Sequence, residues 1–392
     1  MVGLCADWIG IPSEPGVGGL QLGLLGLGLA IALWGALGTR PRARLLVARA
    51  YAMVLSIYLA LWGAELVLTY GLDPARDFKP HALSLPGMYE VGDQVAYRHV
   101  AGYTGTFDDG VLQIPIRINS RGDRDDEPRS EHPAERRILL VGDSFTFGQG
   151  LTDEQKIDRR IEHYSDDEVD AYTLGVMGYG PSNSLRRLKE SSWWTGRAIY
   201  YLFFANDLAD TDARADYYAV HEGFVVRRFR SDGERYTPEQ WTALLHAVRE
   251  RSVHRKGRLR LSFTLPSLRK IAYQVTHENT RLTGIPDALV KPTNIDAAVD
   301  ITTSMLALAR ERGAMFTVVL IPAVGEAKAG KYSDWGRAYI DGITAQGIDV
   351  LDILDRLDGE GYFAHDPHFD PEGADVMARA ILEHFEQSLS SP

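Results

Sequence analysis

The sequence predicts an α/β fold with a mostly parallel, doubly wound sheet. Short apolar runs at residues 138–141 and 199–204 are typical of strands that are buried on both faces. Stretches of helical character alternate with such runs along the C-terminal part of the chain. Polar turn residues follow the runs, at the carboxyl ends of the predicted strands, where sheets of this kind bind ligands.

The composition excludes several classes of protein. The chain has 392 residues, of which 45% are apolar and 24% are charged, as is ordinary for a globular protein with a sizeable core. The formal net charge of −11 argues against nucleic acid as the main partner. Because Cys5 is the one cysteine, an intrachain disulfide and a cysteine metal cluster are both excluded.

The N-terminal part, residues 1–71, predicts a two-helix transmembrane hairpin. Residues 17–37 carry no charge, and a helix needs about 20 such residues to cross a bilayer. The run is too long for a secretory signal peptide and lacks its basic start. A second apolar stretch covers residues 45–70 and is interrupted by Arg49 and Glu65. The alternative for the first run is a buried helix of a soluble domain.

Charge asymmetry predicts the orientation of this hairpin. Arg40, Arg42 and Arg44 lie in the short connection, whereas residues 1–16 contain no Lys or Arg. The connection is then cytoplasmic, and both termini and everything after about residue 71 are extracytoplasmic. In a bacterium this is an inner-membrane protein with its large domain in the periplasm. Glu65 either reaches the headgroup region or has a function within the span.

Residues 72–136 predict a short β-rich lead-in to the main domain. Residues 111–119 alternate apolar and polar side chains, as a half-buried strand does, and Asp108-Asp109-Gly110 before them is a turn signal. Residues 121–136 are highly charged, so we expect a solvated loop that leads into the first strand of the sheet.

Residues 137–392 carry the alternating pattern of the α/β domain. Ser182 is a candidate N-cap for one of the helices. We expect strands at residues 138–141, 171–175, 199–204, 315–322 and 350–353, and helices at residues 155–163, 182–190, 295–312 and 371–389.

Between about residues 210 and 292 the alternation is interrupted by an insertion. Residues 217–229 predict a hairpin with Glu222-Gly223 at its turn. The part that follows is rich in arginine. It is either a patch for an anionic glycan or lipid headgroups, or a solvated helical insertion whose arginines cover apolar surface. Its length and position suggest a cap over one side of the active site.

A serine and a histidine in two of the predicted loops indicate nucleophilic catalysis. Ser144 follows the first strand of the domain in the turn Gly142-Asp143-Ser144, which holds its hydroxyl above the sheet. A serine hydroxyl needs a base to become a nucleophile. His368, just before the last helix, can supply that base, and Asp366 can hold the imidazole in the correct tautomer.

Other groups compete for these roles. His365 is a second candidate base, and Asp370 is a second candidate partner for the histidine. A backbone carbonyl is a third way to orient the imidazole. Acyl transfer also needs hydrogen-bond donors for an oxyanion. The backbone N–H groups of Ser144 and Gly178 and the side-chain amide of Asn206 are the candidates.

At these residues the chain resembles the SGNH (GDSL-like) hydrolases. Ser144 lies in Gly-Asp-Ser, Gly178 in Leu-Gly-Val-Met-Gly-Tyr-Gly and Asn206 in Ala-Asn-Asp, and Asp366 and His368 form the last motif, Asp-x-His. The resemblance covers about residues 137–385, with the insertion interrupting it. The segment from Arg117 to Gly122 (Arg-Ile-Asn-Ser-Arg-Gly) also resembles the lead-in of membrane-anchored members that are linked to cell-surface polysaccharide modification.

The sequence departs from the family pattern at three places. Phe145 replaces the usual Leu of the first motif, and Ala205 stands where Gly often precedes Asn-Asp. Many members have two residues rather than one between the Asp and the His of the last motif. The role of Asp366 is therefore less firmly implied by the resemblance than that of His368.

The resemblance implies a flavodoxin-like three-layer α/β/α fold and esterase or acyl-transfer activity without a metal or other cofactor. Ser144 is then the nucleophile, His368 the base and Asp366 its partner. Topology favours O-acyl groups of a cell-envelope polysaccharide or glycolipid as the substrate. A non-catalytic scaffolding subunit of a membrane assembly is one alternative. A lipase or thioesterase is another; it would need an apolar mouth near Ser144, to which Phe145, Phe147 and Met177 could contribute, although the pattern favours core positions for these three residues.

Overall fold

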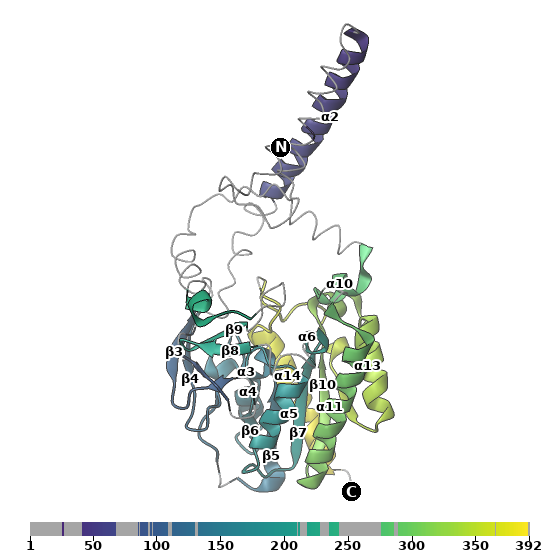
Figure 1. The fold of residues 1–392 in the computed structure, drawn as a ribbon. Helices are drawn as coiled ribbons and strands as arrows, with labels where there is room; N and C mark the ends of the chain where they lie inside the picture. The colour runs from purple at the N-terminus through teal and green to yellow at the C-terminus, as the bar shows by residue number, and fades with distance from the viewer. Residues whose placement is uncertain are drawn as a thin grey trace. The chain divides into compact units, whose positions relative to one another are not determined.

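The structure is a computed structural model, shown as a ribbon in Figure 1. It describes residues 26, 41–67, 85, 87–92, 95, 97–108, 112–129, 132–209, 211, 218–227, 235–242, 276–285, 289–364 and 366–390. The chain forms two compact units, one of residues 1–77 and 255–276 and the other of residues 78–254 and 277–392.

The first unit contains helix α2 (Pro41–Leu66), which covers most of the second predicted apolar segment. Among the residues that the structure describes, no helix combines the length and the apolarity needed to cross a bilayer. The first predicted span, residues 17–37, lies outside the described residues except for Gly26. The predicted two-helix hairpin therefore has no support from the structure.

The second unit is built on a five-stranded sheet in which every pair of neighbours is parallel. Its strands are β5 (Arg137–Gly142), β6 (Asp170–Thr173), β7 (Ala198–Phe204), β10 (Met315–Ile321) and β11 (Asp349–Asp352). They lie in the order β11-β10-β7-β5-β6. When the five strands are numbered 1 to 5 along the chain and read from β6 to β11, the order is 2-1-3-4-5, as in flavodoxin-like folds. The predicted α/β fold with a parallel sheet is confirmed.

Helices cover both faces of this sheet and complete the three layers. Helices α4 (Ile157–Tyr164) and α14 (Pro371–Ser390) pack against one face. Helices α5 (Pro181–Glu190), α11 (Pro292–Glu311) and α13 (Asp334–Ala345) pack against the other. Each face thus has its own hydrophobic core.

Strand β5 shows why a strand between two helical layers is an unbroken apolar run. Ile138 and Leu140 enter the core beneath α4 and α14. Leu139 and Val141 enter the core beneath α5, α11 and α13. All four side chains are fully buried. Because successive side chains of a strand point to opposite faces, a strand covered on both sides needs apolar residues at every position.

The lead-in forms two antiparallel pairs outside the main sheet. Strand β1 (Tyr89–Glu90) pairs with β2 (Arg98–His99), and β3 (Thr104–Asp108) pairs with β4 (Gln113–Arg117). Strand β4 lies within the predicted strand of residues 111–119 and buries alternate residues, as expected. The described residues of this region thus form four short strands in two pairs.

The described part of the insertion contains the predicted hairpin. Strands β8 (Tyr218–His221) and β9 (Phe224–Arg227) are antiparallel, and Glu222 and Gly223 between them have positive φ angles of 50° and 75°. Positive φ at both central residues is typical of the tight turns that join twisted strands. Most of the arginine-rich part of the insertion lies outside the described residues; Arg227, Arg235 and Arg281 lie within them.

The remaining elements are short. They are the helices α3 (Ser144–Phe147), α6 (Asn206–Ala209), α10 (Glu278–Thr283) and α12 (Val324–Ala329), and the 3₁₀ turns η3 (Ala134–Arg136), η4 (Asp153–Gln155) and η6 (Leu354–Arg356).

The prediction that Ser182 caps a helix is wrong. Helix α5 begins one residue earlier, at Pro181, and Gly180 is its N-cap. Proline fits the first helical position because its fixed φ is helical and it has no N–H that needs a partner. The Ser182 hydroxyl instead donates to the backbone carbonyl of Thr211 at 2.7 Å.

Candidate active site

Ser144 lies at the start of α3, directly after the carboxyl end of β5. Asp143 is the N-cap of this helix, and its carboxylate accepts the backbone N–H of Phe145 at 2.9 Å. Gly148 ends the helix after a single turn, with a left-handed φ of 75°. The two strands that flank the point where the strand order reverses are β5 and β7. Ser144 therefore lies where sheets of this topology bind ligands.

Gly142 allows the tight turn before the serine. A Cβ atom at this position would lie 2.3 Å from the Thr146 hydroxyl oxygen and 2.9 Å from the Leu202 carbonyl oxygen. Both distances are shorter than van der Waals contact, and the second atom belongs to the backbone of the neighbouring strand. The glycine is thus required for α3 to turn back over the end of the sheet.

His368 reaches Ser144 from the loop that precedes α14. Its Nε2 atom lies 2.7 Å from the Ser144 hydroxyl oxygen, and its Nδ1 atom is hydrogen-bonded to the Asp366 carboxylate. The same carboxylate accepts the backbone N–H of His368 at 3.0 Å. The Phe363 N–H donates to the His368 carbonyl at 3.0 Å, which holds the loop from its other side. The structure thus brings Ser144, His368 and Asp366 into one hydrogen-bonded chain.

The competing candidates are placed differently. The Asp370 carboxylate accepts the backbone N–H groups of Glu372 at 2.9 Å and Gly373 at 3.1 Å, in the first turn of α14. His365 lies outside the described residues. The hydrogen-bond partner of His368 Nδ1 is therefore the Asp366 carboxylate and not a backbone carbonyl, which was the alternative.

Aromatic side chains surround the histidine. The ring of Phe145 lies against His368, with centroids 4.8 Å apart, and it also contacts Phe369 and Phe204. Phe145 is 3% exposed. Phe145 is the residue that stands where the SGNH hydrolases usually have leucine, and its ring packs against the imidazole that faces Ser144.

Phe145, Phe147 and Met177 are core residues, as the sequence favoured, and they do not form the apolar mouth that a lipase would need. Phe145 belongs to the core beneath α4 and α14. Phe147 and Met177 belong to a cluster with the lead-in. All three are buried, so they are packing residues rather than an exposed surface.

Gly178 lies in the loop that follows β6. This loop packs against α3, the helix that carries Ser144. Gly175 in this loop approaches α3 so closely that a Cβ would lie 2.2 Å from the Phe147 nitrogen. Gly178 has a left-handed φ of 78°, and a Cβ there would lie 2.9 Å from the Tyr97 hydroxyl oxygen. Glycine is therefore favoured by both the backbone angle and the space.

Asn206 follows β7 and begins the short helix α6. Its Nδ2 atom is 3.4 Å from the second carboxylate oxygen of Asp143, the residue before the serine. Its Oδ1 atom is buried and has no hydrogen-bond partner among the described residues. Burial raises the pKa of Asp143 above its ordinary value. The structure thus places Asn206 beside the turn that presents Ser144.

Arg124 of the lead-in loop is a site-supporting residue that the sequence did not reveal. Its guanidinium donates to the backbone carbonyls of Phe147 at 3.2 Å and Gly148 at 2.7 Å, at the C-terminal end of α3, and to that of Leu151 at 2.7 Å, in the turn that follows. Arg124 is 1% exposed. The prediction that residues 121–136 form a solvated loop is wrong for this part, because the carbonyls that end α3 need a buried donor.

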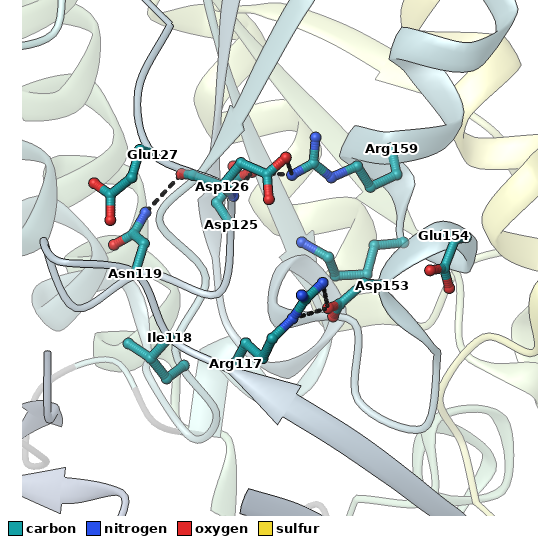
Figure 2. Close-up of a pocket in the computed structure, with 10 residues that line it drawn as sticks. Arg117, Ile118, Asn119, Asp125, Asp126, Glu127, Asp153, Glu154 and Arg159 are labelled. Atoms are coloured by element: carbon teal, nitrogen blue, oxygen red, sulfur yellow. Dashed lines mark hydrogen bonds and ion pairs between the residues drawn. The ribbon is translucent and has the colours of Figure 1, made fainter. Parts of the chain in front are cut away.

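A cavity lined by charged side chains is a separate feature of the described residues. It has a volume of about 410 Å³ and is shown in Figure 2. It is lined by Arg117, Ile118, Asn119, Asp125, Asp126, Glu127, Asp153, Glu154, Lys156 and Arg159, and by none of the predicted site residues.

Most of the charges around this cavity are paired with one another. Arg117 bonds Asp153 at 3.1 Å, and Arg159 bonds Asp126 at 2.7 Å. The ion pairs hold the lead-in loop against η4 and α4. Among the described residues, no three His, Cys, Asp or Glu side chains are grouped so that they can hold a metal ion.

No family model and no curated protein matches this chain. Three similar solved structures are TesA, a lipolytic protein of the G-D-S-L family from Desulfitobacterium hafniense, and the acetyl xylan esterase AlAXEase. TesA is 12% identical over 64% of this chain and 98% of its own, with a TM-score of 0.38. The Desulfitobacterium protein is 12% identical over 64% and 99%, with a TM-score of 0.34. AlAXEase is 8% identical over 63% and 98%, with a TM-score of 0.36.

Proposed function

We propose that this chain is a serine esterase or O-acyltransferase of the SGNH (GDSL-like) type. The observation that carries the proposal is the hydrogen-bonded chain from the Ser144 hydroxyl through His368 to Asp366. It connects a nucleophile, a base and the group that orients the base, which is the arrangement that acyl transfer requires.

In the proposed first step, the Ser144 oxygen attacks the carbonyl carbon of an ester. His368 takes the hydroxyl proton on Nε2, which faces the Ser144 oxygen at 2.7 Å. Asp366 holds the proton on Nδ1 and stabilises the imidazolium that forms. When the tetrahedral intermediate collapses, His368 returns its proton to the leaving alcohol, and the acyl group remains on Ser144.

The tetrahedral intermediate carries a negative oxygen that needs donors. We assign this role to the N–H groups of Ser144 and Gly178 and to the side-chain amide of Asn206. One such donor contributes roughly 3 kcal/mol to the stability of the transition state in enzymes where it has been removed. The loops after β5, β6 and β7 supply one donor each, and these three strands lie side by side in the sheet.

The second step determines whether the enzyme hydrolyses or transfers. Water that attacks the acyl-enzyme completes an esterase cycle, whereas a sugar hydroxyl completes an O-acyltransferase cycle. In both cases His368 takes a proton from the incoming nucleophile and returns it to Ser144. Mixing the protein with 4-nitrophenyl acetate and a sugar acceptor measures the ratio of acetate to acetylated sugar, which separates the two activities.

We also propose that the chain is anchored in a membrane and acts outside the cytoplasm, on O-acetyl groups of a cell-envelope polysaccharide or glycolipid. The support is in the sequence: the uncharged run of residues 17–37 and the arginines at positions 40, 42 and 44 after it. Protease added outside intact cells or spheroplasts tests this orientation. Complete protection of the catalytic domain would contradict it.

A fluorophosphonate probe tests the central proposal, because it reacts with an activated serine. The full-length protein is labelled and mapped by peptide mass spectrometry. We expect labelling at Ser144 that is lost in the Ser144→Ala and His368→Ala variants. His384→Ala is a matched control, since His384 also pairs with an aspartate, Asp349, at 3.0 Å. No labelling of the folded wild-type protein would favour the non-catalytic scaffolding subunit.

A further inference from the structure

The lead-in packs directly against the two segments that carry Ser144 and Gly178. We call the buried cluster that joins them the lead-in core. From the main domain, Phe147 at the end of α3 and three residues of the loop after β6 enter it. The lead-in core consists of Leu85, Met88, Tyr89, Val95, Tyr97, Phe107, Ile114, Ile116, Ile118, Phe147, Val176, Met177 and Tyr179.

Tyr97 makes the polar contacts within this core. Its hydroxyl donates to the backbone carbonyl of Met177 at 2.9 Å, and Tyr97 is 1% exposed. In return, the Tyr179 hydroxyl donates to the backbone carbonyl of Tyr97 at 2.5 Å. The two rings pack edge to face, with centroids 5.3 Å apart. The loop is therefore tied to the lead-in on both sides of Gly178.

The bond to Met177 acts on the proposed oxyanion donor through the peptide plane. The carbonyl of Met177 and the N–H of Gly178 belong to the same peptide group, which is planar and trans, so they point in opposite directions. A donor fixed on the carbonyl oxygen therefore fixes the direction of the N–H. It also polarises the amide, since hydrogen bonds in a chain strengthen one another in a low-dielectric interior.

We propose that Tyr97 is a positioning residue that sets the direction and the donor strength of the Gly178 N–H. The expected effect on kcat rests on the proposed function. The anchoring of the loop by Tyr97 does not depend on that function. It makes the lead-in a working part of the active site rather than a linker.

Loss of the Tyr97 hydroxyl removes the hydrogen bond that holds the carbonyl of the peptide between Met177 and Gly178. Complete removal of an oxyanion donor lowers kcat by roughly 10²- to 10³-fold in known cases. A donor that is present but poorly held retains part of that effect, so we expect Tyr97→Phe to lower kcat about tenfold. KM should change less than about twofold, because the oxyanion forms only in the transition state.

The test compares Tyr97→Phe with Tyr89→Phe in the full-length protein. Tyr89 lies in the same core, 6% exposed, with its ring 5.5 Å from that of Tyr97. Its substitution removes a hydroxyl from the core and leaves the bond from Tyr97 to Met177 in place. We expect both variants to melt at similar temperatures and only Tyr97→Phe to lower kcat on 4-nitrophenyl acetate.

Amide hydrogen exchange gives a readout that does not depend on catalysis. The peptide that covers residues 174–181 should exchange at least threefold faster in Tyr97→Phe than in the wild type or in Tyr89→Phe. Equal exchange in both variants would overturn the proposal, as would equal kcat values in an active enzyme. If the wild-type protein cleaves no ester, the proposed function fails, and the exchange of this peptide alone decides whether Tyr97 positions the loop.

Discussion

Replacing Gly178 with alanine tests the oxyanion assignment at its most constrained point. The residue has a φ of 78°, and left-handed backbone costs an L-residue with a Cβ roughly 1–2 kcal/mol. The new methyl group would also lie 2.9 Å from the Tyr97 hydroxyl oxygen, closer than van der Waals contact. Tyr97 is buried and held by its bond to Met177, so the peptide at Gly178 is the group that must move.

We expect this displacement to lower kcat by between about tenfold and 10²-fold, because the N–H is retained but misdirected. The free energy of unfolding should fall by roughly 1–2 kcal/mol from backbone strain, with a further loss from the contact. The assays are kcat and KM on 4-nitrophenyl acetate, and urea unfolding followed by circular dichroism.

Gly102→Ala is the matched control for strain. Gly102 has a similar φ of 72°, and a Cβ there would have no atom within 4 Å. This variant should lose about the same 1–2 kcal/mol of stability and keep its kcat. A Gly178→Ala enzyme with wild-type kcat and no greater loss of stability than Gly102→Ala would refute the reasoning, because neither the clash nor the oxyanion role would then be real.

Three further predictions concern the histidines and the lead-in. Asp366→Asn should lower kcat at least about 10²-fold at pH 7, since the amide leaves His368 in the wrong tautomer; a pH–rate profile measures it. Burial lowers the pKa of His99 to about 3, so the unfolded state binds a proton that the folded state does not, and stability falls as the pH drops below about 6.5. His99→Gln should reduce the slope of unfolding free energy against pH by up to about 1.4 kcal/mol per unit between pH 6 and 4, measured by urea unfolding. Arg124→Gln should cost about 3 kcal/mol or more, because buried carbonyls at the end of α3 lose their donor; thermal and urea unfolding measure it.

Each of these has its own contradicting result. An Asp366→Asn enzyme with wild-type kcat would move the orienting role to another group. Equal pH slopes in the wild type and in His99→Gln would mean that His99 reaches water in the folded state. Arg117→Gln is the control for Arg124, because its side chain is 70% exposed and should cost less than about 1 kcal/mol. Similar losses in both arginine variants would contradict the buried role of Arg124.

The sheet could be predicted from the sequence because burial on both faces leaves a direct signature. A strand such as β7, with seven consecutive buried residues, consists only of aliphatic and aromatic side chains. The serine turn and the last loop were predictable for a related reason, since the functional residues follow strands or precede a helix. The start of helix α5 differs by one residue from the sequence prediction, because Ser182 is a typical N-cap residue whereas the helix begins at Pro181.

The support of the site could not be predicted in the same way. Tyr97 and Met177 are 80 residues apart in the chain, and their bond depends on a backbone carbonyl, which has no residue-type signal. Arg124 lies in a segment whose charge density indicates exposure, although its own side chain is buried against three carbonyls. Contacts to backbone atoms across long sequence separations are visible only once the fold has brought them together.

The distance in sequence between Ser144 and His368 has a consequence for how the protein is made. The two residues are 224 positions apart. At a synthesis rate of about 5–20 residues per second, Ser144 emerges roughly 10–45 s before the histidine that hydrogen-bonds to it. Under the proposed mechanism, the growing chain carries the nucleophile during this interval without its base. We then expect the hydroxyl to gain its reactivity only when the last helix docks, so that the nascent chain does not attack esters before that point.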